Sequence, residues 1–326
     1  MNKNTFVGML FALLIVANFY IYSRIITNDI PDPVYPDYDS VTFEENISDE
    51  GTNSENSEYM YVGVKVSDTN SGFLQLVNTS HSYVFDNTPD KVLKEKNVSV
   101  YAEKSPSYSV KDINVKLDKT VISALSAMLD DFSAHLGGAK NVIVTQGLRT
   151  YDEQKEMLDL KVAQYGPDQT IAQKPGYSEH HTGYALDIST FVNGVMGTFT
   201  GENEYAWVHE NAHKYGFILR YPEGKEDITG ISHESWHFRY VGVPHAQYMY
   251  RNNLTLEEYI EQLALYPFES GQLEITDEVT GDVYRIYSVA VTQDDTQIPV
   301  PTSATGSVYT LSGDNNGHVI VTVKQK

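Results

Sequence analysis

The sequence predicts an α+β fold: helices packed on a mainly antiparallel sheet, with an N-terminal transmembrane anchor and a small C-terminal β appendage. Three observations predict it. Amphipathic helices and short strand-like runs share the stretch 59–266. An uncharged apolar run lies near the N-terminus. After Pro267 there are strand-like segments and turns but no helical period.

The first element is the run Asn4–Ser23, which has no charged residue and lies between Lys3 and Arg24. As a helix rising about 1.5 Å per residue, it would span the hydrocarbon core of about 30 Å. Asn18–Tyr22 is bulky, and a signal peptidase prefers small residues at its cleavage site. We therefore expect residues 1–28 to be an uncleaved single-pass anchor, rather than a cleaved signal or a buried core helix.

The following segment, residues 29–58, is acidic and contains no Lys or Arg. It also carries Pro31, Pro33 and Pro36. Like charges repel one another and favour an extended chain. This composition predicts a disordered tether outside the membrane, and hence an extracellular location for the body of the protein.

The stretch 59–266 is expected to form the main domain. Helical spacing of apolar residues, strand-like runs and capping or turn residues define its elements. The expected strands are 59–66, 73–77, 141–145, 184–188, 217–221 and 236–241, and the expected helices are 118–136, 151–165, 203–215 and one beginning at the capping box Thr255-x-x-Glu258.

The C-terminal appendage, residues 267–326, is expected to be all-β. Strand-like runs cover 283–291 and 319–323, with turns at 281–282 and 313–317. Two roles remain open for it: a lid over an exposed sheet edge, or a separate contact module.

Composition excludes several classes of function. There are 23 basic against 44 acidic residues, a net charge of −21. Such a chain lacks the clustered cations that a general nucleic-acid binder needs. There is no Cys, which excludes disulfides, thiolate metal sites and a Cys nucleophile. Any metal site must use His, Asp or Glu.

Two stretches, 178–187 and 234–237, carry the residue types of such a site. His180, Asp187 and His237 offer two nitrogens and one oxygen, and three protein ligands with one open position are typical of catalytic zinc. Glu234 precedes His237 by three residues and could take a proton from the attacking water, then return one to the leaving amine. On spacing alone, ordinary core histidines and a salt bridge are favoured over a metal site.

The same residues resemble a known family. Ser178-x-His180-x-x-Gly183-x-Ala185-x-Asp187, followed by Glu234-x-Trp236-His237, is similar to the signature of the VanY-like D-alanyl-D-alanine carboxypeptidases. These belong to a wider group of zinc peptidases with lysostaphin-type and hedgehog-like folds. The resemblance extends over about residues 73–262. It includes Leu76–Asn78, Gln146–Thr150 and Tyr215–Pro222.

The resemblance implies a role for each matching position. His180, Asp187 and His237 would bind one Zn²⁺ per chain, and Glu234 would be the general base and acid. Arg149 would polarise the scissile carbonyl. Gln154 and Ser178 would hold the terminal region of the substrate, and Tyr221 is a weaker candidate for the same pocket. The sequence around Arg149 is Gln-Gly-Leu-Arg-Thr, where relatives commonly have Ser-Gly-Tyr-Arg-Ser, so the lining of the pocket is open.

The implied function is that of a membrane-tethered zinc D,D-carboxypeptidase. It would remove the C-terminal D-alanine from peptidoglycan stem peptides outside the cell. An L,D-carboxypeptidase, a peptidoglycan endopeptidase and a non-catalytic wall-binding module stay as alternatives. The oligomeric state is left open.

Overall fold

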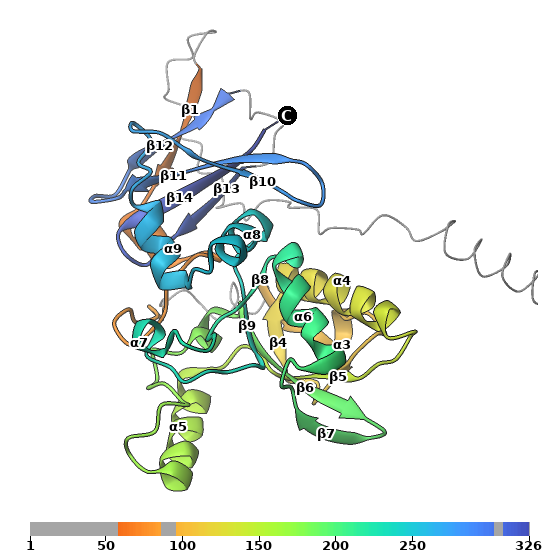
Figure 1. Ribbon diagram of the computed structural model, residues 1–326. Coiled ribbons are helices and arrows are strands. Elements are labelled where there is room, and N and C mark those ends of the chain that lie inside the picture. The colour runs from red at the N-terminus through yellow and green to blue at the C-terminus, as the bar shows by residue number, and fades with distance from the viewer. Residues whose placement is uncertain (1–57, 86–95, 303–308, 326) are drawn as a thin grey trace, which may run out of the picture. The chain divides into compact units, whose positions relative to one another are not determined.

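The computed structural model describes residues 58–85, 96–302 and 309–325 (Figure 1). The expected anchor, residues 1–28, lies outside the described residues, and so does the expected tether except for Glu58. Among the helices of the described part, none has the length and apolar character needed to cross a membrane.

The central sheet confirms the predicted fold class. Its strands are antiparallel to their neighbours except for the parallel pair β3 and β5, and β7 pairs with β6. In spatial order, the strands are β3 (Ser109–Val110), β5 (Val142–Gln146), β6 (Ala185–Val192), β9 (His237–Tyr240) and β8 (Phe217–Leu219), with β7 (Val195–Thr198) beside β6. A separate pair joins β2 (Asn97–Ser99) to β4 (Lys116–Asp118).

The longest helix within the described ranges is α4 (Lys119–His135), which follows the prediction closely. Its N-cap Asp118 accepts a hydrogen bond from the backbone of Thr120. Apolar side chains at helical spacing, including Leu125 and Phe132, are buried in the main hydrophobic core. The helix ends before two glycines with positive φ, as the sequence predicts.

The other helices are shorter. α5 (Tyr151–Tyr165) and α9 (Leu256–Leu263) each begin at a capping box. The remaining α-helices of the described residues are α3 (Val100–Glu103), α6 (Ala206–Asn211), α7 (Glu226–Thr229) and α8 (Val243–Asn252). The 3-10 turns in the same residues are η1 (Val66–Asn70), η2 (Glu179–Thr182), η3 (Asn203–Tyr205) and η4 (Ala212–Tyr215).

The C-terminal segment is a β structure. Its antiparallel sheet has the order β10 (Leu273–Thr276), β11 (Val283–Ala290), β14 (His318–Lys324) and β13 (Tyr309–Gly313). The expected strands 283–291 and 319–323 are confirmed as β11 and β14. A second sheet pairs β12 (Thr296–Pro301) with β1 (Tyr59–Val64), from the other end of the described chain. The domain boundary predicted at 266/267 stays a prediction. Strand β1, which precedes this boundary in the sequence, pairs with β12, which follows it.

Two expected elements are wrong. No strand forms over 73–77; instead, Nη2 of Arg239 donates hydrogen bonds to the carbonyls of Phe73 (3.0 Å) and Gln75 (2.8 Å), so a guanidinium replaces a neighbouring strand. The helix expected over 203–215 is divided into η3, α6 and η4. At Asn211 the backbone leaves helical geometry (φ −121°), and its side chain donates to the carbonyl of Trp207.

Candidate active site

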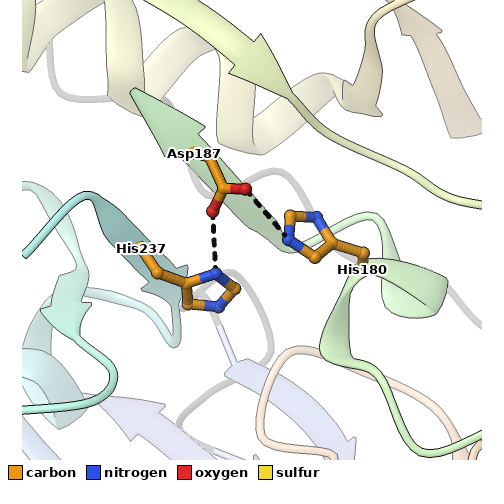
Figure 2. Close-up of side chains that lie close together, drawn as sticks. All are labelled: His180, Asp187 and His237. Atoms are coloured by element: carbon orange, nitrogen blue, oxygen red, sulfur yellow. Dashed lines mark hydrogen bonds and ion pairs between the residues drawn. The ribbon is translucent and has the colours of Figure 1, made fainter. Parts of the chain in front are cut away.

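Three predicted ligands meet at the centre of the main sheet. His180 lies in η2, Asp187 in β6 and His237 in β9. Asp187 and His237 stand directly opposite each other in the antiparallel register of β6 and β9. Side chains at directly opposed positions lie on the same face of a sheet, which brings these two together. Figure 2 shows the carboxylate of Asp187 between the two imidazole rings.

The donor atoms of this group are close enough to share one ion. Nε2 of His180 lies 3.6 Å from Oδ2 of Asp187, and Nδ1 of His237 lies 2.9 Å from Oδ1 (Figure 2). One donor atom from each residue lies within 4.8 Å of the others. Both histidines are buried, and Asp187 is partly exposed.

The orientation of His180 is set by a backbone contact. Its Nδ1 donates to the carbonyl of Gly147 at 2.7 Å, so Nε2 faces Asp187 with its lone pair. Gly147 directly follows β5 and lies in close contact with β4. A Cβ atom built on Gly147 would lie 2.2 Å from the carbonyl oxygen of Lys116. Glycine is therefore required at this position for the two backbones to approach.

The carboxylate of Glu234 lies at the edge of the group. Its Oε2 is 3.7 Å from Nδ1 of His237. Its backbone N–H donates to the carbonyl of Tyr221 at 3.1 Å, which holds the loop before β9 in place. Burial raises the pKa of Glu234 to about 7. The positive charge of His237 acts to lower this pKa, and the negative charge of Asp187 acts to raise it. A carboxyl group with such a pKa can both accept and donate a proton near neutral pH.

Arg149 is held by two glutamines beside this group. Its Nη1 donates to Oε1 of Gln154 at 2.6 Å and its Nη2 to Oε1 of Gln146 at 3.3 Å. The guanidinium is largely buried and interacts electrostatically with Asp187 and Glu234. Gln154 is itself tied by Nε2 to the carbonyl of Gln173. In this structure Gln154 therefore orients Arg149.

Ser178 and Tyr221 also lie next to the predicted ligands. Ser178 is buried and precedes η2, and its hydroxyl does not cap that turn. The ring of Tyr221 lies 4.9 Å from the ring of His237, centroid to centroid. The Cζ atom of Arg220 lies over the ring of Tyr221, 5.0 Å from its centroid. Tyr221 thus contacts the predicted ligand His237. Its role toward substrate stays a prediction, as does that of Ser178.

One residue of the site carries no sequence prediction. Glu179, between Ser178 and His180, is fully buried and pairs with the guanidinium groups of Arg220 and Arg239 at 2.7 and 2.8 Å. Burial alone would raise its pKa, but these two positive charges outweigh burial and hold the pKa well below its ordinary value. The sequence does contain a signal for this role. Arg220 and Arg239 stand in otherwise apolar, strand-like stretches, and a buried cation requires an anion as its partner.

Comparison with protein families supports the resemblance seen in the motifs. The VanY family model, described as D-alanyl-D-alanine carboxypeptidase, matches residues 114–243. This segment contains the two motif stretches and Arg149.

Two curated relatives extend the match. The D-alanyl-D-alanine carboxypeptidase of Enterococcus faecium is 36% identical over 252 residues, covering 77% of this chain and 75% of the relative. The bifunctional D-Ala-D-Ala dipeptidase and D-Ala-D-Ala carboxypeptidase VanXYC of Enterococcus gallinarum is 38% identical over 134 residues, covering 39% of this chain and 70% of the relative. The first match extends well beyond the segment of the family model.

A solved structure is similar over most of the chain. The vancomycin resistance D,D-dipeptidase VanXYg, in complex with a D-Ala-D-Ala phosphinate analogue, is 27% identical with a TM-score of 0.70. The similarity covers 82% of this chain and all (100%) of that chain. Motif residues, sheet topology and sequence identity agree, and the chain belongs to the VanY family of zinc D-alanyl-D-alanine carboxypeptidases.

Proposed function

We propose that this protein is a zinc-dependent D,D-carboxypeptidase that removes the C-terminal D-alanine from peptidoglycan stem peptides. The observation that carries the proposal is the group His180, Asp187 and His237, whose donor atoms lie within 4.8 Å of one another beside Glu234. Family membership supplies the substrate class.

The donor set fits zinc. Two imidazole nitrogens and one carboxylate oxygen are ligands that Zn²⁺ accepts, with bonds of about 2.0–2.2 Å. One donor atom from each of the three residues lies within 4.8 Å of the others. The two imidazoles face different oxygens of Asp187, at 3.6 Å and 2.9 Å. When bound, Zn²⁺ would polarise the scissile carbonyl and lower the pKa of a water to about 7.

The chain's own residues supply the remaining chemistry. Glu234, with a pKa near neutrality, takes the proton of the attacking water and returns a proton to the departing amine of D-alanine. Arg149, oriented by Gln154 and Gln146, presents a fixed cation to the oxygen on which negative charge develops. A preorganised donor of this kind contributes about 3 kcal/mol to stabilisation of the transition state.

The test is mass spectrometry of a stem pentapeptide ending in D-Ala-D-Ala after incubation with the protein. We expect loss of one alanine, abolished by a chelator and restored by added Zn²⁺. Glu234→Gln should bind Zn²⁺ with the stoichiometry of the wild type and release no alanine, because it keeps the shape of the side chain and removes the base.

Three other substrates or products distinguish the alternatives. Release of alanine from a tetrapeptide alone would indicate an L,D-carboxypeptidase, and larger fragments an endopeptidase. Free D-Ala-D-Ala is included because the similar solved structure is a D,D-dipeptidase. Zinc binding without any product would contradict the proposal and favour a wall-binding module.

We further propose that Asn4–Ser23 anchors the protein in the cell membrane, with the carboxypeptidase part outside. The uncharged apolar run and the acidic segment after it support this placement. Fractionation of cells expressing the full chain should recover it in the membrane, and protease added to intact protoplasts should degrade the body. Recovery in the medium, with a new N-terminus, would indicate a cleaved signal instead.

A further inference from the structure

A buried ion-pair cluster of Glu179, Glu257, Arg220 and Arg239 lies directly behind the metal-ligand group. Arg220 donates through Nη1 and Nη2 to both carboxylate oxygens of Glu257, at 2.8 and 2.6 Å. Through Nε it also donates to Oε1 of Glu179 at 2.7 Å, and Arg239 donates to the same oxygen at 2.8 Å. The two negative and two positive charges of this buried cluster therefore sum to zero.

Within this cluster, one oxygen is left for another partner. Both guanidinium groups contact Oε1 of Glu179, so its Oε2 remains available. This Oε2 lies 3.5 Å from Nε2 of His237. Both atoms are buried, and neither has a hydrogen-bond partner in the described part of the chain. A buried polar atom without a partner is rare, and each of these two faces the other.

This juxtaposition decides which nitrogen of His237 is presented to the metal. A carboxylate paired with two guanidinium groups accepts hydrogen bonds, so Nε2 is placed to donate toward Glu179. Nδ1 lies 2.9 Å from Oδ1 of Asp187, and with zinc bound it would give up any proton and offer its lone pair to the metal. Nδ1 is the nitrogen beside Asp187. His180 has the opposite arrangement, because its Nδ1 donates to the carbonyl of Gly147 and its Nε2 faces Asp187.

We propose that Glu179 is a positioning residue that holds the ring of His237 in the tautomer and orientation needed for metal binding through Nδ1. The inference rests on the proposed zinc site. Arg220 and Arg239 hold Glu179, and the ring of Tyr221 lies against that of His237 at 4.9 Å, so the imidazole is held at its edge and on its face. Carboxylates behind ligating histidines typically change metal affinity by about 10- to 100-fold.

A purely structural role for Glu179 is the competing explanation, and Glu257 offers the matched control. Both carboxylates pair with Arg220, so Glu179→Gln and Glu257→Gln each remove one negative charge from the same cluster. Glu257 has no contact with His237 among the interactions of the described residues. Both variants should unfold at lower temperature than the wild type.

The experiment measures zinc affinity of the full chain by competition with a chromophoric chelator. We expect Glu179→Gln to bind Zn²⁺ about 10- to 100-fold more weakly than the wild type, and Glu257→Gln to stay within about twofold. Equal zinc affinity in the two variants would overturn the inference. Absence of stoichiometric zinc binding by the wild type would instead contradict the proposed function.

A second measurement does not depend on a variant that folds. In the zinc-loaded wild type, long-range ¹H–¹⁵N correlation spectra report which nitrogen of each histidine carries a proton. We expect His237 to be protonated at Nε2 and His180 at Nδ1. Protonation of His237 at Nδ1, with Nε2 binding the metal, would overturn the inference even if both variants misfolded.

Discussion

Arg149 shows how single side chains prepare this site. Its guanidinium is held by Oε1 of Gln154 and Oε1 of Gln146, and its backbone N–H donates to the carbonyl of His180 at 3.0 Å. Arg149 therefore links Gln154 and Gln146 to η2, the turn that carries the proposed ligand His180. Neither glutamine contact follows from the motif, because Gln154 is on helix α5 and Gln146 is on strand β5.

At the residue scale, Arg149→Met should lower kcat/KM on the stem pentapeptide by about 100- to 1,000-fold, because a fixed donor to the developing oxyanion is lost. Zinc stoichiometry should stay unchanged, since Arg149 supplies no ligand. The control is Lys155→Met, which removes a cation from the exposed face of the same region, where Lys155 pairs with Asp159. Similar losses in both variants would show that net charge, and not the position of Arg149, matters.

At the scale of elements, the site depends on how closely β4 and β5 approach. The backbone N–H of Leu148 donates to the carbonyl of Lys116 at 2.7 Å, immediately after Gly147. The carbonyl of Gly147 then accepts from Nδ1 of His180. The packing of two strand ends therefore determines the orientation of the proposed ligand His180 in η2.

Gly147→Ala should accordingly lower the free energy of unfolding by at least about 2 kcal/mol, because its Cβ would overlap a backbone carbonyl that cannot move freely. Zinc affinity should fall as well. Gly63→Ala is the control: its Cβ would meet only the end of the Gln297 side chain, at 3.4 Å. Urea denaturation and chelator competition measure the two effects, and an unchanged Gly147→Ala variant would contradict this account of the strand contact.

At the scale of the whole described chain, the C-terminal β structure shares its interior with the carboxypeptidase part. Leu273, Ile275, Ile286 and Ile320 belong to the same hydrophobic cluster as the residues of α4 and the central sheet. His245 of α8 joins the two parts by polar contacts, through Tyr259 at 2.7 Å and Thr322 of β14 at 3.0 Å. The appendage is therefore packed against the domain, and its role stays a prediction.

The burial of His245 predicts a pH dependence of stability. Burial lowers its pKa to about 3, against 6.5 in the unfolded chain. The unfolded state therefore binds one more proton between these values, and stability present above pH 6.5 is lost as the pH falls, by about 1.4 kcal/mol per pH unit.

His245→Gln should lower stability at pH 7 but show a shallower loss between pH 6.5 and 4.5 than the wild type. Urea denaturation at several pH values measures the slope. The control His135→Gln changes an exposed histidine and should keep the slope of the wild type. Parallel pH profiles of wild type and His245→Gln would contradict the assignment.

Local sequence patterns predict most of the helices and strands and the chemistry of the candidate ligands. The bounds of α4 and α5 and the capping box of α9 follow from periodicity and caps, which depend on residues a few positions apart. α8 was missed because its buried face includes polar His245 and Gln247, which hide the helical period. The absence of Cys limited any metal site to imidazole and carboxylate ligands.

How distant segments of the chain meet is visible in the three-dimensional fold alone. The register that sets Asp187 opposite His237, the return of β1 to pair with β12, and the facing of Glu179 toward His237 all join residues far apart in the chain. No local pattern encodes such pairings, because they depend on which hydrogen-bond and packing partners the complete fold supplies. For the same reason, a single arginine replaced an expected strand contact at Phe73 and Gln75.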